Sequence, residues 1–392
     1  MSSNPSPLLM IIAGEASGDM HGAALVKELK KSLPHMHFFG VGGFEMQRQG
    51  VELVHTVKDL AVLGAIEIIR HYPRLRRIFH ELIDMARLRK PDAVILIDYP
   101  GFNIRLARFL KRHNIPVIYY ISPQIWAWGQ HRRKTIAERV DKMLVFFDFE
   151  KDFYHDTSLD VEFIGHPLVD KLPVPDERHV FFERIGCKPE KPIVGLLPGS
   201  RENEIKRLLP IMLRTASIIQ KKMPETQFVL PVGNVVPKDT LLKIFNTMTQ
   251  QYPFKVKILE NGVVDTMAYA DLVLIASGTA TLETACYATP MIIVYKVNFI
   301  TALLARAVIK IPYIGLVNVV AGNKVVPEFL QGNARPQRIA HCIEQYLSDS
   351  KELSAFRNEL KKIKARLGQP GAVHRAAGAV IRFLDDVSKS KK

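Results

Sequence analysis

The chain has 392 residues, of which 47% are hydrophobic and 24% are charged. This composition is close to that of a soluble globular protein, and it excludes a disordered chain, a collagen-like fibre and a small disulfide scaffold. The net charge of +15 indicates anionic partners, which could be nucleic acid, anionic lipid or phosphorylated substrates.

The cysteines and the apolar runs indicate the cellular compartment of the protein and its relation to the membrane. The three cysteines lie far apart without metal spacing, so we expect reduced structural thiols in a reducing compartment. The first residues carry no Lys or Arg and the apolar run that follows is short, which does not fit a secretory signal. The apolar stretch 299–320 carries Arg306 and Lys310, whose charges oppose membrane insertion. We expect a cytoplasmic protein, soluble or peripheral, without a spanning helix.

Short apolar runs alternate with helical patterns along the chain, in two similar halves. In the first half we predict strands at 8–13, 93–97, 117–121, 143–147 and 161–164, and helices at 20–33, 73–89 and 103–113. In the second half we predict strands at 193–197, 228–232, 256–259, 272–276 and 291–295, and a helix at 204–223. Continuous apolar strands separated by helices are typical of parallel sheets covered on both faces. The sequence therefore predicts an α/β fold of two Rossmann-like domains whose parallel sheets face a central cleft.

A polar, proline-punctuated segment separates the two halves and sets the domain boundaries. We predict an N-terminal domain at 1–170, a linker at 171–192 and a C-terminal domain at 193–345. Residues 346–387 are predicted to form C-terminal helices that pack across the domains or are exchanged between the subunits of a dimer. The basic tail 388–392 is predicted to be disordered.

The loop Gly14-Glu15-Ala16-Ser17-Gly18-Asp19 connects the first strand to its helix. Its glycines allow close approach of a ligand to the backbone. The carboxylates of Glu15 and Asp19 suit sugar hydroxyls better than a bare phosphate. The alternative is a tight turn in which Asp19 caps the helix.

Asp98 ends a buried strand, at the edge of a parallel sheet where active sites form. A carboxylate there can act as a general base, or it can be an ordinary turn residue. Both tryptophans, Trp126 and Trp128, follow the next strand. They either pack within the fold or stack on a ligand.

Two loops of the second half combine small residues, hydroxyls and charge at the start of a helix. Gly199, Ser200 and Arg201 form a credible diphosphate site, because an Arg fork adds to the backbone donors of a helix N-terminus. The second loop holds Ser277, Gly278 and Thr279, followed by Glu283, whose carboxylate can accept hydrogen bonds from ribose. Each loop alone is equally compatible with an ordinary capped helix; together they favour a nucleotide diphosphate.

The segment 60–77 begins with an apolar run and ends in a cluster of arginines. It is either a core helix with a solvated basic end or an interfacial segment, with its apolar side in lipid and its arginines on headgroup phosphates. Residues 302–310 could add a second patch. Zinc-protease, serine-hydrolase and zinc-finger spacings are absent, as is a DxD pair, so the sequence predicts no metal and no cofactor.

Several motifs are long and unusual, and together they resemble those of lipid-A-disaccharide synthases in the same order. They are Gly-Glu-Ala-Ser-Gly-Asp at 14–19, Ile-Asp-Tyr-Pro-Gly-Phe-Asn at 97–103, Ser-Pro-Gln-Ile-Trp-Ala-Trp at 122–128, Phe-Ile-Gly-His at 163–166, Leu-Leu-Pro-Gly-Ser-Arg at 196–201 and Ala-Ser-Gly-Thr-Ala at 276–280. The match extends over nearly the whole chain.

This resemblance implies a GT-B glycosyltransferase of lipid A (lipopolysaccharide) biosynthesis. The family condenses UDP-2,3-diacylglucosamine with 2,3-diacylglucosamine 1-phosphate (lipid X), giving the β-1,6-linked disaccharide 1-phosphate and UDP. The reaction is inverting and independent of metal. The enzyme acts as a peripheral protein at the inner face of the cytoplasmic membrane, and the family includes homodimers that exchange C-terminal elements.

The resemblance also implies roles for individual residues. Asp98 is expected to be the general base on the acceptor 6-hydroxyl, and Arg201 to stabilise the departing diphosphate. The UDP-sugar is expected to contact Gly199, Ser200, Ser277, Gly278, Thr279, Glu283 and Asn318. The sugar cleft is expected to involve Glu15, Ser17, Asp19 and Asn103, and the membrane and acyl patch Leu63, Ile66, Ile69, Arg70, Arg74 and Arg77.

Two rival functions remain at the level of sequence. One is another GT-B enzyme, such as a UDP-sugar 2-epimerase, which would not need the patch at 60–77. The other is a basic module that binds membrane or nucleic acid. The dispersed basic residues and the absence of a recognised nucleic-acid motif disfavour the nucleic-acid version, and we expect no nucleic-acid partner.

Overall fold

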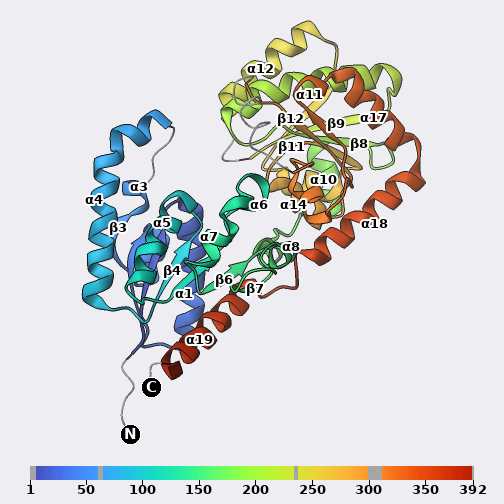
Figure 1. The fold of residues 1–392 in the computed structure, drawn as a ribbon. Helices are drawn as coiled ribbons and strands as arrows, with labels where there is room; N and C mark the ends of the chain where they lie inside the picture. Colours follow the sequence, from blue (N-terminus) through green and yellow to red (C-terminus); the bar gives the residue numbers. More distant parts are fainter. Residues whose placement is uncertain (1–5, 61–64, 234–236, 299–310, 391–392) are drawn as a thin grey trace. The chain divides into compact units, whose positions relative to one another are not determined.

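The computed structural model describes residues 6–60, 65–233, 237–298 and 311–390, with the backbone alone for 65–71. The chain forms two compact units. Unit 1 comprises residues 1–170 and 368–392, and unit 2 comprises residues 171–367. Each unit contains one parallel β-sheet with helices around it (Figure 1). The predicted α/β class with two parallel sheets is therefore confirmed.

The sheet of unit 1 has seven strands in the order β3-β2-β1-β4-β5-β6-β7. They are β1 (Leu8–Ala13), β2 (His37–Gly42), β3 (Glu52–Thr56), β4 (Ala93–Ile97), β5 (Val117–Tyr120), β6 (Lys142–Val145) and β7 (Asp160–Phe163). The strand order reverses between β1 and β4, which both lie in the centre and pair in register, Ala13 opposite Ile97. Such a reversal is where α/β sheets bind ligands.

Two of these strands were not predicted from the sequence. Strand β2 contains Gly40 and Gly42, and glycine is depleted in strands. Strand β3 lies at the sheet edge and is only partly buried, so it lacks a continuous apolar run.

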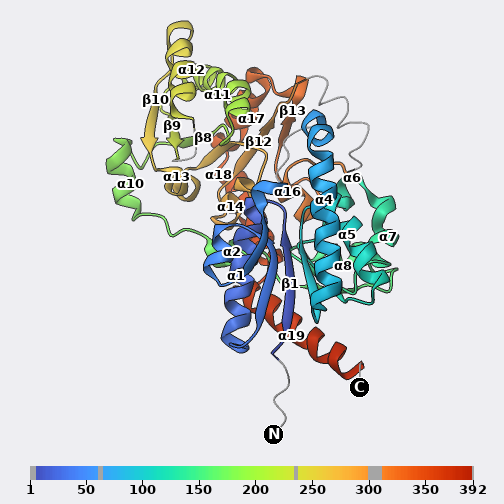
Figure 2. The same cartoon turned by 90° about the vertical axis from the view of Figure 1, so that its left-hand side faces the viewer.

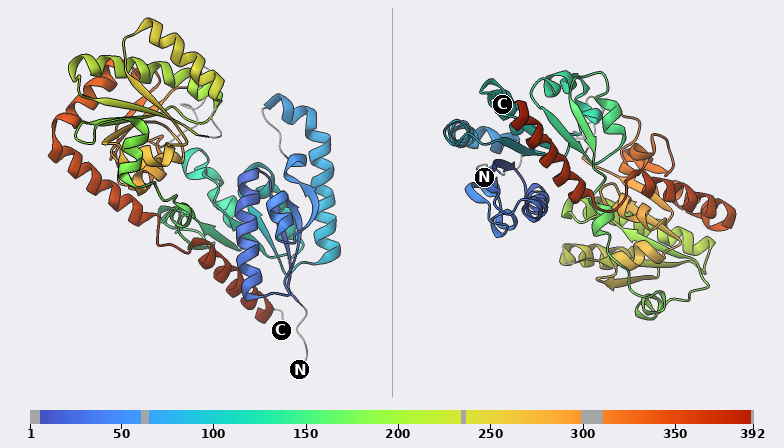
Figure 3. Two further views of the ribbon diagram at one scale, coloured as in Figure 1. Left: turned by 180° about the vertical axis from the view of Figure 1, so that it is seen from behind. Right: turned by 90° about the horizontal axis from the view of Figure 1, so that it is seen from below.

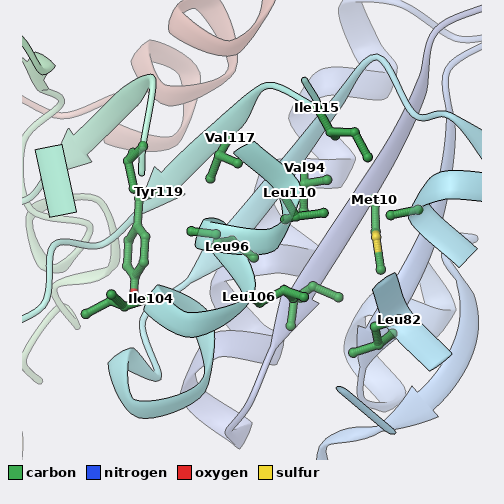
Figure 4. Packing of buried hydrophobic residues seen from close by; sticks show 14 of the residues in the cluster. Met10, Leu82, Val94, Leu96, Ile104, Leu106, Leu110, Ile115, Val117 and Tyr119 are labelled. Atoms are coloured by element: carbon green, nitrogen blue, oxygen red, sulfur yellow. The ribbon is translucent and has the colours of Figure 1, made fainter. Parts of the chain in front are cut away.

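The helices of unit 1 lie on both faces of its sheet. They are α1 (Ala16–Ser32), α2 (Phe44–Arg48), α3 (Val57–Leu60), α4 (Ala65–Arg89), α5 (Pro100–Arg112), α6 (Ile125–Trp128), η1 (Gln130–Arg132), α7 (Arg133–Ala137), α8 (Phe149–Phe153), α9 (Leu168–Lys171) and α19 (Ala372–Ser390). Figure 2 shows α1 and α2 on one side of β1, with α4 and α5 on the other. Leu82 of α4 and Leu106 of α5 share a core with the strand residues Met10 and Leu96 (Figure 4).

The sheet of unit 2 has six strands in the order β10-β9-β8-β11-β12-β13. They are β8 (Ile193–Leu197), β9 (Gln227–Val232), β10 (Val256–Glu260), β11 (Leu272–Ala276), β12 (Met291–Tyr295) and β13 (Glu328–Leu330). The short edge strand β13 was not predicted. The order again reverses at the centre, between β8 and β11, so the loops that follow these two strands lie side by side.

The helices of unit 2 are α10 (Arg178–Ile185), α11 (Glu202–Lys222), α12 (Lys238–Gln251), α13 (Val263–Tyr269), α14 (Ala280–Cys286), α16 (Leu316–Ala321), η2 (Gln331–Asn333), α17 (Pro336–Ser348) and α18 (Ser350–Arg366). Helices α11, α12 and α17 share one core with the sheet, and α14 packs against α18. Helix α10 falls within the segment 171–192, which the sequence assigns to a linker.

After α18 the chain returns to unit 1, where α19 packs along α1 (Figure 3). The carboxylate of Asp170 accepts hydrogen bonds from the backbone N–H groups of Gly371 and Ala372. Arg375 donates from Nε to the carbonyl of Ile164 at 2.8 Å. Helix α19 continues to Ser390, into the segment 388–392 where the sequence predicts disorder.

Candidate functional site

Asp98 follows β4 directly, at the reversal point of the unit 1 sheet. It has φ of 44° and Tyr99 has φ of 46°, so both lie in the left-handed region. Burial raises the pKa of the Asp98 carboxyl to about 6, the nearby charge of Glu15 adds to the rise, and a hydrogen bond from the Tyr99 backbone opposes it. A carboxylate with a pKa this close to neutrality is suited to take up a proton during catalysis.

The two carboxylates of the loop 14–19 lie in different environments, one exposed and one buried. Glu15 is the exposed N-cap residue of α1, and its negative charge contributes to the raised pKa of Asp98. Ser17 is also exposed. Asp19 instead is buried, and it accepts hydrogen bonds from the backbone N–H groups of Gly43, Glu45 and Met46 at 2.7–3.1 Å.

Asp19 therefore caps α2, because these N–H groups have no partner within that helix. The sequence offered a sugar contact or a cap on α1 for this residue. The structure contradicts the cap on α1, because the N-cap residue of that helix is Glu15. Both oxygens of Asp19 accept hydrogen bonds from the start of α2.

Asn103 also forms its hydrogen bonds inside unit 1. Its side chain is fully buried on α5, and its Nδ2 donates to the carbonyls of Ile97 and Asp98 at 3.1 and 2.8 Å. The amide thus holds the main chain at Asp98, whereas the family resemblance suggested a sugar contact for Asn103.

Two further titratable groups lie where β6 and β7 end, and sequence analysis gave neither a role. Glu150 is buried, and it accepts hydrogen bonds at 3.2 Å from Nε1 of Trp126 and from the backbone of Phe147. Burial raises its pKa to about 7. Burial also lowers the pKa of His166 to about 4, with a smaller contribution from the charge of His21. Trp126 thus packs within unit 1.

The loop after β8 requires a glycine. Gly199 has φ of 100°, and a Cβ atom there would lie 2.3 Å from Oε2 of Glu204. The side chain of Arg201 is 84% exposed and approaches Glu204 only to 3.5 Å. Since such a loose, exposed pair contributes little, the guanidinium is available to an anion.

The loop after β11 holds Ser277, Gly278 and Thr279, and Thr279 is the N-cap residue of α14. The Ser277 hydroxyl donates to the carbonyl of Ile314 at 3.3 Å. Glu283 is half-buried in α14, and burial raises the pKa of its carboxyl.

A cavity of about 250 Å³ joins the two loops of unit 2. It is lined by residues from the start of α11, the end of β11 and the end of β12: Arg201, Glu202, Asn203, Glu204, Arg207, Leu208, Ala276, Ser277, Tyr295, Lys296 and Val297. The predicted convergence of Arg201 and Ser277 is thus observed. Gly199, Ser200, Gly278, Thr279 and Glu283 flank these residues in sequence without lining the cavity.

Arg207 and Lys296 add two cations that the sequence analysis missed. Neither forms an ion pair with a carboxylate in the part of the chain that the structure describes. The sequence held only a weak signal for Arg207: it lies within two helical turns of Arg201, although residues six apart project about 120° apart around a helix. Lys296 gave no such signal, since it directly follows β12 and is far from α11 in the sequence.

Asn318 is fully buried and all of its polar capacity is used inside unit 2. Its Oδ1 accepts from the backbone of Val325 and Val326, and its Nδ2 donates to the carbonyl of Val326 and to Glu328. Glu328 also accepts from the backbone of Ile314 and Gly315 at 3.0 Å. Asn318 therefore shapes the loop 314–328, and its side chain has no free group for the nucleotide.

The predicted membrane and acyl patch lies only partly within the described residues. Leu63 and the second patch at 302–310 lie outside them, and Ile66, Ile69 and Arg70 belong to α4 with the backbone alone. The guanidinium of Arg74 pairs with Asp59, and Arg77 lies 3.6 Å from Glu81. Tyr72 is 56% exposed and lines a surface cavity with Pro73, Arg76, Arg77 and His80.

Across the described ranges, no helix has both the length and the apolar character needed to span a bilayer. The same residues contain no cluster of three or more His, Cys, Asp or Glu side chains that could bind a metal ion.

Similarity to known proteins extends over nearly the whole chain. A family model described as lipid-A-disaccharide synthetase matches residues 9–380. The lipid-A-disaccharide synthase of Syntrophus aciditrophicus is 42% identical over 97% of this chain and 98% of its own. That of Geobacter sulfurreducens is 40% identical over 98% of this chain and 99% of its own.

The chain belongs to the lipid-A-disaccharide synthase family. It is a glycosyltransferase of lipid A biosynthesis, which confirms the resemblance that the motifs carry. The family implies a UDP-sugar donor and lipid-linked substrates. It also decides against the two rivals left open by the sequence, the epimerase and the basic binding module.

Solved structures show how widely this fold is shared. They include a putative UDP-N-acetylglucosamine 2-epimerase from Listeria monocytogenes, with a TM-score of 0.62 and 12% identity over 97% of each chain. MurG of Acinetobacter baumannii has a TM-score of 0.58 and 15% identity over 96% of this chain and 100% of its own. At these identities the likeness shows the GT-B fold alone.

Proposed function

We propose that this lipid A glycosyltransferase condenses UDP-2,3-diacylglucosamine with 2,3-diacylglucosamine 1-phosphate by an inverting, metal-independent displacement. The Asp98 carboxylate takes the proton of the acceptor 6-hydroxyl as that oxygen forms a bond to the anomeric carbon. The bond from this carbon to the diphosphate breaks, and UDP leaves with its electron pair. The observation that carries the proposal is the Asp98 carboxyl, with its pKa near 6, at the reversal point of the unit 1 sheet.

Unit 2 is proposed to bind the donor through the cavity between the loops after β8 and β11. Arg201, Arg207 and Lys296 would neutralise the diphosphate, and the N–H groups at the start of α11 would add donors along the helix axis. Oriented cations of this kind stabilise the charge that develops on the leaving diphosphate. The half-buried Glu283 is proposed to accept hydrogen bonds from ribose.

Gly199, Ser200, Gly278 and Thr279 are proposed to contribute backbone and hydroxyl donors beside this cavity. Glu15 and Ser17, both exposed at the start of α1, are proposed to contact the sugar near Asp98. Asp19, Asn103 and Asn318 each form hydrogen bonds with the main chain, so for these residues we propose structural roles.

Binding to the inner face of the cytoplasmic membrane is proposed to occur through the amphipathic helix α4. The net charge of +15 and the exposed Arg76 and Arg77 beside Tyr72 favour an anionic lipid surface. We also propose a homodimer that exchanges C-terminal elements. Helix α19 joins unit 1 late in the sequence, so a partner's α19 could make the same contacts with α1 and Asp170.

The test is UDP release from UDP-2,3-diacylglucosamine in mixed micelles, with and without the monosaccharide 1-phosphate. We expect release that depends on the acceptor, and a disaccharide product by mass spectrometry. Asp98→Asn should lower kcat by about 10²- to 10⁴-fold, the usual contribution of general-base catalysis, while UDP still binds. Near-normal turnover by the folded Asp98→Asn protein would remove the assigned base.

The pH profile gives a second readout of the same carboxyl group. A base must be deprotonated, so kcat should fall as the pH drops through the Asp98 pKa of about 6. Glu15→Gln removes the negative charge that helps to raise this pKa, so the acid limb should move to lower pH. The exposed Glu190→Gln in unit 2 is the matched control and should leave the limb in place. A limb that stays at the same pH in Glu15→Gln would contradict the pairing of Glu15 with Asp98.

A further inference from the structure

Two consecutive residues with side chains adopt left-handed backbone conformations where β4 ends. Asp98 has φ of 44° and Tyr99 has φ of 46°. This region is unfavourable for residues that carry a Cβ atom. Two such residues in a row persist only where their surroundings hold them, and that arrangement is common where a side chain must point in one direction.

Both main-chain groups of Asp98 are held in place. Its N–H donates to the carbonyl of Tyr120 at 3.1 Å. Its carbonyl accepts from two side chains, the Tyr119 hydroxyl at 2.6 Å and Nδ2 of Asn103 at 2.8 Å. Figure 4 shows Tyr119 extending from β5 toward α5, with its ring beside Ile104. Tyr119 and Asn103 are both fully buried, so both donors reach the Asp98 carbonyl from inside the fold.

Tyr99 is fixed from the opposite direction. Its hydroxyl donates to the carbonyl of Leu60 at 2.8 Å, and its ring occupies the space above Gly14. A Cβ atom at Gly14 would lie 2.3 Å from Cγ of Tyr99. The residue after Asp98 therefore cannot turn without losing its place against the first loop.

We propose that Tyr119 and Asn103 are positioning residues for the general base: together they hold the Asp98 carbonyl so that the carboxylate stays in its half-buried place beside Glu15. The inference rests on the proposed role of Asp98. Neither residue needs to touch substrate, because both act on the main chain behind the reacting side chain.

The strand β5 supplies its own control. Tyr120 neighbours Tyr119 and is also fully buried, but its hydroxyl has no hydrogen-bond partner among the residues that the structure describes. Packing alone could be met by phenylalanine at either position. At position 119 the hydroxyl has a defined acceptor, and that acceptor belongs to Asp98.

Among the described residues, the titratable groups that interact with Asp98 are Glu15, Tyr99 and Tyr119. Burial raises the pKa of Tyr99, with the charge of Glu15 adding to the rise. Burial also raises the pKa of Tyr119 well above its ordinary value, and the charges of Asp98 and Tyr154 add to it. Both tyrosines therefore stay protonated near neutral pH, so a shift of the acid limb in a Tyr119 variant reports on Asp98.

The experiment compares Tyr119→Phe, Tyr120→Phe and Asn103→Asp in the full-length protein. Tyr119→Phe should lower kcat about tenfold, which corresponds to losing 1.4 kcal/mol of transition-state stabilisation. The KM values and UDP binding should stay within about twofold, because a positioning residue acts on the chemical step. The acid limb should move below pH 6 as the Asp98 carboxylate becomes more solvated.

The other two variants are compared with Tyr119→Phe in kcat and in the position of the acid limb. Tyr120→Phe deletes a hydroxyl of equal burial and should leave kcat and the acid limb unchanged. Asn103→Asp places an acceptor where the carbonyls of Ile97 and Asp98 need a donor, so it should reduce kcat more than Tyr119→Phe does. Thermal unfolding of each variant checks that the protein is folded at the assay temperature.

Two results would overturn the proposal. One is an unchanged kcat in folded Tyr119→Phe and Asn103→Asp. The other is an equal loss in Tyr119→Phe and Tyr120→Phe with the acid limb unmoved, which a purely structural role would produce. Asp98→Asn distinguishes failure of the two proposals. Turnover by Asp98→Asn would reject Asp98 as the general base. An inactive Asp98→Asn together with a fully active Tyr119→Phe would reject only the positioning role of Tyr119.

Discussion

A cation binds an anionic ligand best when no carboxylate has already neutralised it, and the basic residues at the start of α11 differ in this respect. Lys206 lies 2.6 Å from Glu202. Arg207, the next residue along, lines the cavity of unit 2 and pairs with no described carboxylate. Lys296, which directly follows β12, lines the same cavity and likewise pairs with no described carboxylate. At this scale, the surrounding carboxylates distinguish a binding cation from a surface one.

This contrast predicts the effect of neutralising each residue. Arg207→Met and Lys296→Met should each weaken UDP binding about tenfold or more, since a hydrogen bond between charged groups is worth about 1.5–3 kcal/mol. Lys206→Met, on the same turn of α11, should change UDP binding less than twofold. Isothermal titration calorimetry with UDP measures all three. Equal weakening by all three variants would indicate a general effect of charge instead of a defined site.

Among the secondary-structure elements, α2 shows how a short helix depends on a distant one. It has five residues, too few to be stable alone. Asp19 on α1 satisfies three of its first N–H groups. Gly43 permits this contact, because a Cβ atom there would lie 2.5 Å from Oδ2 of Asp19.

Asp19→Ala should therefore lower the free energy of unfolding by about 2–3 kcal/mol, because it leaves three N–H groups of α2 without a charged acceptor. Thermal or urea unfolding monitored by circular dichroism measures this loss. UDP binding to unit 2 should be unaffected. Loss of UDP affinity with unchanged stability would instead contradict the structural role and indicate that Asp19 binds a ligand.

At the scale of the whole molecule, the proposed membrane binding combines the net charge of +15 with the apolar sequence at the start of α4. Long-range attraction to anionic lipid is screened by salt, whereas the contact of apolar side chains with the bilayer is not. Membrane binding should therefore weaken with ionic strength without disappearing.

Co-sedimentation with vesicles that contain anionic lipid measures this binding. Arg76→Glu with Arg77→Glu in α4 should reduce binding at low salt by tenfold or more, because each cation near the surface contributes about 1 kcal/mol, or about fivefold in affinity. The matched control reverses two exposed cations of α18, Lys361→Glu with Lys362→Glu. If both pairs reduced binding equally, total charge and not α4 would govern the interaction.

Ten strands of the two sheets follow from their apolar runs, and five of them have the predicted bounds, such as Leu8–Ala13 and Leu272–Ala276. Central strands of a parallel sheet are buried on both faces, so their sequences are continuously apolar. The strands that the sequence did not predict, β2, β3 and β13, are glycine-rich, half-exposed or only three residues long. Their pairing depends on neighbours that local sequence does not contain.

The sequence by itself determined the two-sheet α/β fold, the loops at the strand ends and the family, because these depend on local pattern and on long motifs. The tertiary structure alone decided what the polar residues of those motifs do. Asp19, Asn103 and Asn318 appear as ligand contacts in the motifs, but each hydrogen-bonds the main chain. Arg207 and Lys296 lack a motif and line the cavity of unit 2. The physical reason is that a buried polar group must satisfy whichever backbone donor or acceptor the fold brings beside it, and that neighbour is often distant in sequence.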